Sequence, residues 1–239
     1  MSYTGNIIPD RFIASLSYRK EYLKNLATTI SAFYVGSIQD RFSYTYSSDF
    51  NRDGQTNDLI YIPKDRSEID FVDIPAGQSG YGRAYTAQEQ KDAFFNYVAQ
   101  DKYLSSHQGE YAERNGAKMP WLHRVDLKIV QEVFKNIGGK KNSFQFTADI
   151  LNFTNLLNKN WGTLKRINTQ SILVPWNPAP VNGNTSGSSN TNHIVVGGTA
   201  APKYRLASFN NDLVRSSFSD NQTISSTYYM QFGVRYNFN

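Results

Sequence analysis

The sequence of 239 residues predicts an all-β fold, in which about five antiparallel strands form a segment of a larger transmembrane β-barrel and carry two long loops. Three observations support this fold class. Several segments alternate apolar and polar residues with period two, the connections between them are alternately short and long, and their apolar sides lack charged residues. The alternation is most regular at the carboxyl terminus, in residues 226–239.

Composition excludes several other classes of protein. Only 39% of the residues are hydrophobic and the mean hydropathy is -0.54, so no run approaches the ~18 apolar residues of a membrane-spanning helix. Alternating strands have low mean hydropathy because half of their side chains face water. The absence of cysteine excludes disulfides, thiolate metal sites and thiol nucleophiles. The net charge of +5 comes from scattered lysines and arginines, which predicts no nucleic-acid partner.

The first two predicted strands cover residues 11–19 and 26–46, joined by a polar turn over residues 20–25. The apolar face of the first consists of Phe12, Ala14, Leu16 and Tyr18. That of the second consists of Leu26, Thr28, Ile30, Ala32 and Tyr34, with strand-like residues continuing through Phe42, Tyr44 and Tyr46.

Residues 47–120 lack sustained alternation and predict a very long loop. Within it, Thr86 and Glu89 have the spacing of a capping box, which predicts a helix from Ala87 to about Gln100. Phe94, Phe95 and Val98 would lie on one side of this helix.

Three more strands are expected after Trp121. In the first, Val125, Leu127 and Ile129 oppose polar neighbours until a tight turn over residues 136–140, which contains two glycines. The second places Phe144, Phe146, Ala148 and Ile150 on one face. A second long loop covers about residues 156–225, with a low-complexity stretch at 181–199. The terminal strand places Tyr228, Met230, Phe232, Val234, Tyr236 and Phe238 on its apolar face.

The distribution of charge between the two faces favours a membrane wall. None of the apolar faces carries a charged residue, and a lysine or arginine at the bilayer midplane would cost ~2–4 kcal/mol. The charged residues of the opposite faces are expected to line an aqueous lumen: Arg124, Asp126, Lys128, Asp149 and Arg235. Trp121 is expected at the outer membrane interface. The short turns would be periplasmic and the long loops extracellular.

Four stretches of the sequence carry a family resemblance. They are FSYTY at 42–46, DFNRDGQTNDLIYIP at 49–63, WLHRVDL at 121–127 leading into DILNFTN at 149–155, and FGVRYNFN at 232–239. On these stretches the chain resembles the carboxyl-terminal part of a TonB-dependent outer-membrane receptor of Bacteroidetes, of the SusC-like and Oar-like groups. None of the four stretches is a catalytic motif, and the chain is not expected to be an enzyme.

The resemblance implies a 22-stranded barrel with an amino-terminal plug, located in the bacterial outer membrane. Such a protein imports a large nutrient, which is a glycan, a peptide or a siderophore-like compound. The implied partners are the rest of the barrel and plug, the TonB complex through the plug, outer-membrane lipid and a surface lipoprotein. The chain departs from the family pattern because it has no plug, no TonB box and about five strands. Residues 1–239 are therefore expected to be the last part of the wall, as a fragment or a split subunit. Residues 1–9 show no signal peptide, which export of such a chain needs. Either the chain is a mature or truncated piece, or the membrane interpretation is wrong.

One segment has the spacing of a calcium loop, with hard oxygen ligands at nearly every second position and Gly54 at the sharp turn. Its candidate ligands are Asp49, Asn51, Asp53, Gln55, Asn57 and Asp58. Ile60 stands where an EF-hand has a bidentate glutamate, so the match is incomplete. The alternative is a turn rich in Asp and Asn that holds no ion.

Other residues give weaker functional signals. His107, His123 and His193 are far apart and have no triad or metal spacing, so no catalytic residue is expected. Tyr236 and Phe238 would form the barrel-assembly signal. Several loop tyrosines could bind sugars or peptides: Tyr46, Tyr61, Tyr81, Tyr85, Tyr97, Tyr103 and Tyr111. The alternative function is a secreted soluble β-sandwich adhesin or glycan-binding module that uses the same tyrosines.

Overall fold

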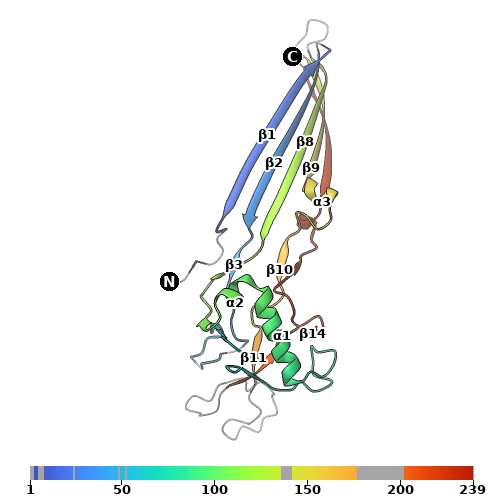
Figure 1. Ribbon diagram of the computed structural model, residues 1–239. Coiled ribbons are helices and arrows are strands. Elements are labelled where there is room, and N and C mark those ends of the chain that lie inside the picture. The colour runs from blue at the N-terminus through green and yellow to red at the C-terminus, as the bar shows by residue number, and fades with distance from the viewer. Residues whose placement is uncertain are drawn as a thin grey trace. The chain divides into compact units, whose positions relative to one another are not determined.

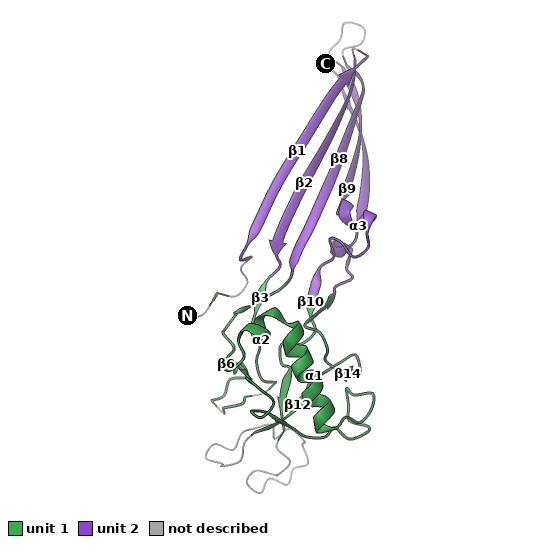
Figure 2. Ribbon diagram, viewed as in Figure 1, with its two compact units in different colours: residues 1–7, 40–119, 166–219 green, residues 8–39, 120–165, 220–239 purple. Residues whose placement is uncertain are grey.

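The computed structural model describes residues 3–4, 8–23, 25–47, 49–51, 53–135, 142–176 and 202–238, with Lys135 described by its backbone only. The fold is mostly β, and most of its strand pairs are antiparallel (Figure 1). The chain divides into two compact units (Figure 2). The strand unit comprises Ile8–Gln39, Pro120–Lys165 and Asp220–Asn239, and the loop unit comprises Met1–Ile7, Asp40–Met119 and Arg166–Ser219.

The strand unit contains one five-stranded sheet. Its strands are β1 (Arg11–Tyr22), β2 (Leu26–Ile38), β8 (Trp121–Lys135), β9 (Ser143–Leu151) and β16 (Tyr229–Asn237). They lie in the order β1-β2-β8-β9-β16, and each pair of neighbours is antiparallel. The five predicted strands are confirmed, and their order in the sheet follows their order along the chain.

The register places the predicted apolar faces on one side of this sheet. One row of directly opposed residues runs across all five strands through Leu16, Ala32, Leu127, Ile150 and Met230. Residues opposed in this way point to the same face of a sheet. The neighbouring row contains only polar residues and points to the other face: Ser17, Ser31, Lys128, Asp149 and Gln231.

A bulge interrupts β8 between Glu132 and Phe134. Because the bulge inserts one extra residue, Phe134 lies opposite Phe144 on the apolar face. Strict alternation from Leu127 would have placed Phe134 on the polar face. The sequence analysis did not predict this bulge.

The predicted second strand is too long. β2 ends at Ile38, and the alternation beyond it belongs to the loop unit, where Phe42, Tyr44 and Tyr46 are buried in a hydrophobic core. The short strand β3 (Arg41–Phe42) pairs there with β7 (Ala117–Lys118). Period-two alternation shows that one side of a segment is shielded from water. It does not show whether that side faces lipid or packs in a protein core.

The loop unit has its own core, so the predicted long loop over residues 47–120 is only partly a loop. Helix α1 (Ala87–Gln100) has the predicted bounds and begins with the predicted capping box. The Thr86 hydroxyl accepts from the Glu89 amide at 3.1 Å, and the Glu89 carboxylate accepts from the Thr86 amide at 2.8 Å. The helix buries Phe94, Tyr97 and Val98 in the core of the loop unit.

The remaining elements are short. Helix α2 (Lys102–Ser106) follows α1, and α3 (Phe153–Leu157) follows β9. A 3₁₀ turn covers Ile224–Ser226. The other strands form four small sheets. Three are pairs: β4 (Tyr61–Ile62) with β6 (Glu110–Tyr111), β13 (Ser208–Phe209) with β14 (Asp212–Leu213), and β10 (Lys165–Ile167) with β15 (Phe218–Asp220). In the fourth, β12 (Lys203–Leu206) lies between β11 (Leu173–Pro175) and β5 (Asp70–Phe71).

The predicted glycine turn at 136–140 and the low-complexity stretch at 181–199 lie outside the described residues. Where the chain is described, none of its helices has the length and apolar character needed to span a membrane.

Candidate functional site

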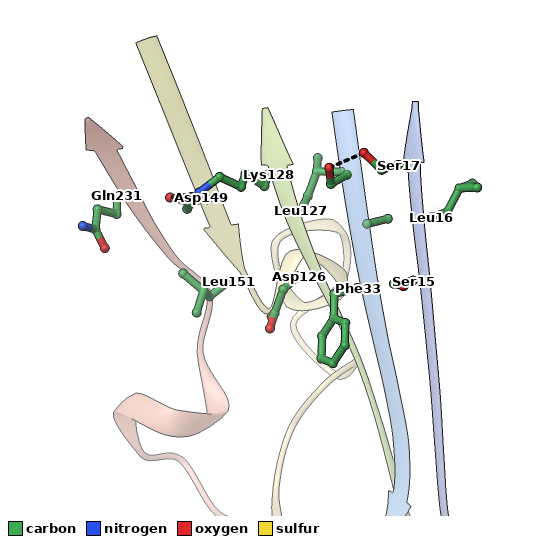
Figure 3. Close-up of a pocket in the computed structure, with 12 residues that line it drawn as sticks. Ser15, Leu16, Ser17, Phe33, Asp126, Leu127, Lys128, Asp149, Leu151 and Gln231 are labelled. Carbon is green, nitrogen blue, oxygen red and sulfur yellow. Dashed lines mark hydrogen bonds and ion pairs between the residues drawn. The ribbon is translucent and has the colours of Figure 1, made fainter. Parts of the chain in front are cut away.

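The polar face of the sheet carries a hollow of about 490 Å³ (Figure 3). Residues from all five strands line it. Figure 3 shows Lys128 extending toward Asp149, and a hydrogen bond of 2.8 Å joins the hydroxyls of Ser17 and Ser31. The polar row described above therefore forms the centre of this surface.

Ion pairs connect neighbouring positions of this face. Lys128 of β8 pairs with Asp149 of the adjacent strand β9 at 3.0 Å, and Arg124 pairs with Asp126 of the same strand at 3.0 Å. Arg235 lies opposite Gln145, which places it on the same face. The five residues expected to line a lumen thus share one face of the sheet, although their position in a lumen stays a prediction.

Arg19 forms a second ion-pair group on the polar face. Its guanidinium pairs with Glu132 of β8 at 2.6 Å and with Glu21 of its own strand at 3.0 Å. The sequence analysis did not single out these residues. The period-two alternation of β1 and β8 could have placed Arg19, Glu21 and Glu132 on the polar face. Pairing Arg19 with Glu132, however, could be predicted only with the register of the strands.

The motifs 121–127 and 149–155 meet in the strand unit. The Asn152 amide donates to the carboxylate of Asp126 at 2.7 Å, while the Asn152 side chain donates to the carbonyls of Gly162 and Ser226. The side chain of Asn155 accepts from the Tyr228 amide at 3.2 Å. These motif residues therefore hold the connection between β9 and β16 in place, a structural role that the sequence analysis missed.

The apolar face of the sheet is uncovered within the described part of the chain. Phe232 is 75% exposed, Leu16 is 74% exposed and Phe146 is 47% exposed. A soluble sandwich would cover such side chains with a second layer. Apolar side chains exposed across several strands indicate a surface that contacts lipid or another protein.

Aromatic rings lie near both ends of the apolar face. Near one end, Phe12, Tyr34, His123 and Trp121 follow one another with ring centroids 5.9 to 6.2 Å apart. Near the other end, the corresponding contacts join Phe134, Phe144, Phe146, Tyr236 and Phe238. Rows such as that of Leu16 and Leu127 lie between the two ends.

The candidate calcium ligands lie in one largely exposed loop of the loop unit. Several of their oxygens accept hydrogen bonds from backbone amides of the same loop. Asp49 accepts from the amide of Gly54 at 2.9 Å, and Asp58 accepts from the amide of Phe50 at 2.6 Å. Gly54 has a φ of +89°, as the sharp turn requires. Across the described residues, no group of three His, Asp or Glu side chains is arranged to hold a metal ion. The calcium site in this loop and the ion-free turn both stay predictions.

The loop tyrosines differ in their exposure. Tyr46, Tyr85 and Tyr97 are buried in the core of the loop unit, and Tyr61, Tyr81 and Tyr103 are partly buried. Tyr111 is 68% exposed. His107 stacks on Tyr103, while His193 lies outside the described residues.

Comparison with known proteins gives no further assignment. A scan against protein-family models and searches of curated proteins and of solved structures found no match for this chain. The function is therefore argued from the two faces of the sheet and from the loop unit.

Proposed function

We propose that this chain forms part of the wall of a transmembrane β-barrel in a bacterial outer membrane, and that this barrel is a TonB-dependent transporter for a large nutrient. The apolar face of the five-stranded sheet would contact lipid. The polar face would line the aqueous interior. The chain would have no enzymatic role in this process.

One observation carries the membrane part of the proposal. The register of five consecutive strands places their apolar faces on one continuous side, and the row from Leu16 to Met230 crosses the whole sheet. Among the described strand residues the charged exception on this side is Lys20, near the end of β1. Transmembrane β-strands need ≈ 9–11 residues, and these strands have 9 to 15. A sheet of this kind can remain uncovered by protein if hydrocarbon is its neighbour.

The aromatic rings at the two ends support the same orientation. Tyrosine and tryptophan concentrate where a membrane meets water, because their rings are apolar and their hydroxyl or N–H groups are polar. Trp121 and Tyr34 would lie at one interface, and Tyr236 at the other. The ion pair of Lys128 in β8 with Asp149 in β9 would face water, because each of these charges would be costly in hydrocarbon.

The ends of the strands suggest which side faces outward. The connection between β1 and β2 has three residues, whereas the connections between β2 and β8 and between β9 and β16 carry the loop unit. In outer-membrane barrels the short turns are periplasmic and the long loops extracellular. The loop unit would therefore be extracellular and help to collect the nutrient.

The outer strands β1 and β16 each have one neighbour in the described sheet. Unpaired backbone groups cannot face hydrocarbon, so both edges would pair with further strands of the barrel. Import energised by the TonB complex through a plug, and binding of a surface lipoprotein, rest on the family resemblance of residues 49–63 and 232–239 alone.

A matched pair of variants tests the proposal. Phe232→Lys changes the apolar face, and Gln231→Lys places the same charge at the neighbouring position on the polar face. We expect Phe232→Lys to destabilise the parent protein folded in phospholipid vesicles by ~2–4 kcal/mol, and Gln231→Lys to change that stability by less than about 1 kcal/mol. Urea titration of the vesicle-bound parent protein gives both values.

Equal effects of the two substitutions would contradict a lipid-facing surface, since both side chains would then be in water. A chain that is folded and monomeric in plain buffer, without vesicles or detergent, would favour the alternative of a soluble adhesin or glycan-binding module.

A further inference from the structure

A second hollow, of about 280 Å³, lies entirely within the loop unit. It is formed by the segment around β4 and β5 together with residues of β6, β11 and β12. Pockets for whole small molecules usually have volumes of ≈ 300–1,000 Å³, so this hollow suits a single side chain better than a complete ligand.

Five aromatic rings line this hollow: Tyr46, Phe50, Tyr61, Tyr111 and Tyr204. Tyr46 and Tyr204 are buried, and their rings lie nearly parallel at 5.9 Å with an interplanar angle of 12°. Phe50 stacks on Tyr46 at 3.8 Å. Tyr111 is exposed and contacts Tyr61 at 5.3 Å with a tilt of 60°. The hollow thus has a buried aromatic floor and an exposed aromatic rim.

The charged residues that line this hollow are both acidic, Glu68 and Asp70. In the described chain, the hydrogen bonds to Glu68 from the Tyr61 hydroxyl and the Lys64 amide both end on Oε2, which leaves Oε1 to accept from a ligand. Asp70 pairs with Lys91 at the long distance of 3.4 Å, and its side chain is 62% exposed. The carboxylates therefore give this aromatic hollow a negative charge.

We propose that this hollow binds the cationic side chain of a lysine or arginine residue in a peptide. Aromatic faces attract a cation with about 0.5–1 kcal/mol at exposed sites and ≈ 2 kcal/mol or more where water is excluded. The carboxylates of Glu68 and Asp70 supply the charge-assisted hydrogen bonds that an ammonium or guanidinium group requires. The further step, that a basic peptide is the cargo, rests on the proposed transport function.

A sugar fits this hollow less well. Two acidic side chains without a basic one among the lining residues favour a cationic group over a neutral ligand.

The test uses the whole chain, folded in an uncharged polyoxyethylene detergent, and isothermal titration calorimetry. The probes are the acetylated and amidated tripeptide Gly-Lys-Gly, the corresponding Gly-Gln-Gly peptide, and maltoheptaose. We expect the lysine peptide to bind about tenfold more tightly than the glutamine peptide, and raised salt to weaken its binding. Glu68→Gln keeps an acceptor for Tyr61 and should weaken binding of the lysine peptide about fivefold.

Glu113→Gln serves as the control, since it removes one exposed negative charge of the same unit that does not line the hollow. It should leave the affinity unchanged. If Glu68→Gln fails to fold by circular dichroism, Asp70→Asn provides the same test. Equal affinity for the two peptides, no detectable binding of the lysine peptide, or preferential binding of maltoheptaose would overturn the proposal. None of these results depends on membrane insertion, which the variants at Gln231 and Phe232 test separately.

Discussion

Two buried tyrosines of the loop unit show how much a hydroxyl's surroundings matter. Tyr44 donates to Asp101 at 2.6 Å, and Asp101 also accepts from the backbone at the start of α2. Tyr97 is equally buried, and its hydroxyl lies beside those of Ser217 and Tyr44 without a hydrogen bond of good geometry. Burial disfavours the tyrosinate and raises the pKa of Tyr97 to about 12, although the neighbouring hydroxyls partly oppose this shift.

This pKa predicts an alkaline loss of stability. The unfolded chain releases the Tyr97 proton near pH 10.0, whereas the folded chain retains it up to about pH 12. The contribution of Tyr97 to the free energy of unfolding should therefore be constant below about pH 9 and fall above pH 10, by up to about 1.4 kcal/mol per pH unit. Tyr97→Phe should reduce that slope and leave stability at neutral pH unchanged or about 1 kcal/mol higher.

Tyr44→Phe is the matched control, because it removes a hydrogen bond to a buried carboxylate and should lower the free energy of unfolding by about 2 kcal/mol at neutral pH. Urea unfolding followed by tryptophan fluorescence measures both variants. A large destabilisation by Tyr97→Phe at neutral pH would contradict the assigned environment of its hydroxyl.

Asn152 combines an unusual backbone conformation with a full set of contacts. Its φ is +52°, its side chain is buried, and that side chain donates to the carbonyls of Gly162 and Ser226. Asparagine tolerates the left-handed region better than alanine does.

We expect Asn152→Ala to lower the free energy of unfolding by about 3 kcal/mol, since it removes both hydrogen bonds and adds backbone strain. Asn152→Gly removes the same hydrogen bonds but relieves the strain, so it should cost about 1 kcal/mol less. Denaturant titration of the two variants separates these contributions. Equal losses would show that the backbone conformation contributes little.

At the scale of elements, the sequence was sufficient where local rules decide the structure. Period two identified β1, β8, β9 and β16, and the Thr86–Glu89 capping box identified the start of α1. The sequence was insufficient where the structure depends on the partner of a segment. Examples are the end of β2 at Ile38 and the bulge before Phe134. Both depend on which residues pack or pair with the segment, and the sequence of the segment alone does not specify these partners.

The terminal strand gives a prediction at this scale. Tyr236 and Phe238 lie on the apolar side with ring centroids 5.7 Å apart, and Phe238 is 79% exposed. If this aromatic end is the assembly signal, Phe238→Asp should reduce the amount of the parent protein in the outer membrane several-fold. Asn237→Asp, on the polar face, should have little effect. Surface labelling of cells measures both, and a normal surface level of Phe238→Asp would remove the assembly role.

At the scale of the whole molecule, the main surprise is that the predicted loops build a unit with its own core. Leu173 and Leu206, from the second long connection, join Phe94 and Tyr97 from the first. No local pattern predicts this whole core, because its members come from α1 and from short strands far apart in the sequence. The hollow proposed to bind a cationic side chain is also built from segments far apart in the sequence, since β4, β6 and β12 each contribute to it.

The proposed wall depends on the two faces of the sheet lying in different solvents. Because the chain contains no cysteine, a single cysteine can be introduced and labelled at each position of β16, from Tyr229 to Asn237. The label then reports whether its position is in lipid or in water, by its accessibility to a lipid-soluble and to a water-soluble quencher.

The most direct measurement is this cysteine scan in vesicles that contain the assembled parent protein. We predict that labels at Met230, Phe232, Val234 and Tyr236 are quenched from the lipid phase, and that labels at the alternate positions are quenched from water. Quenching from water at every position, or a pattern without period two, would contradict the account.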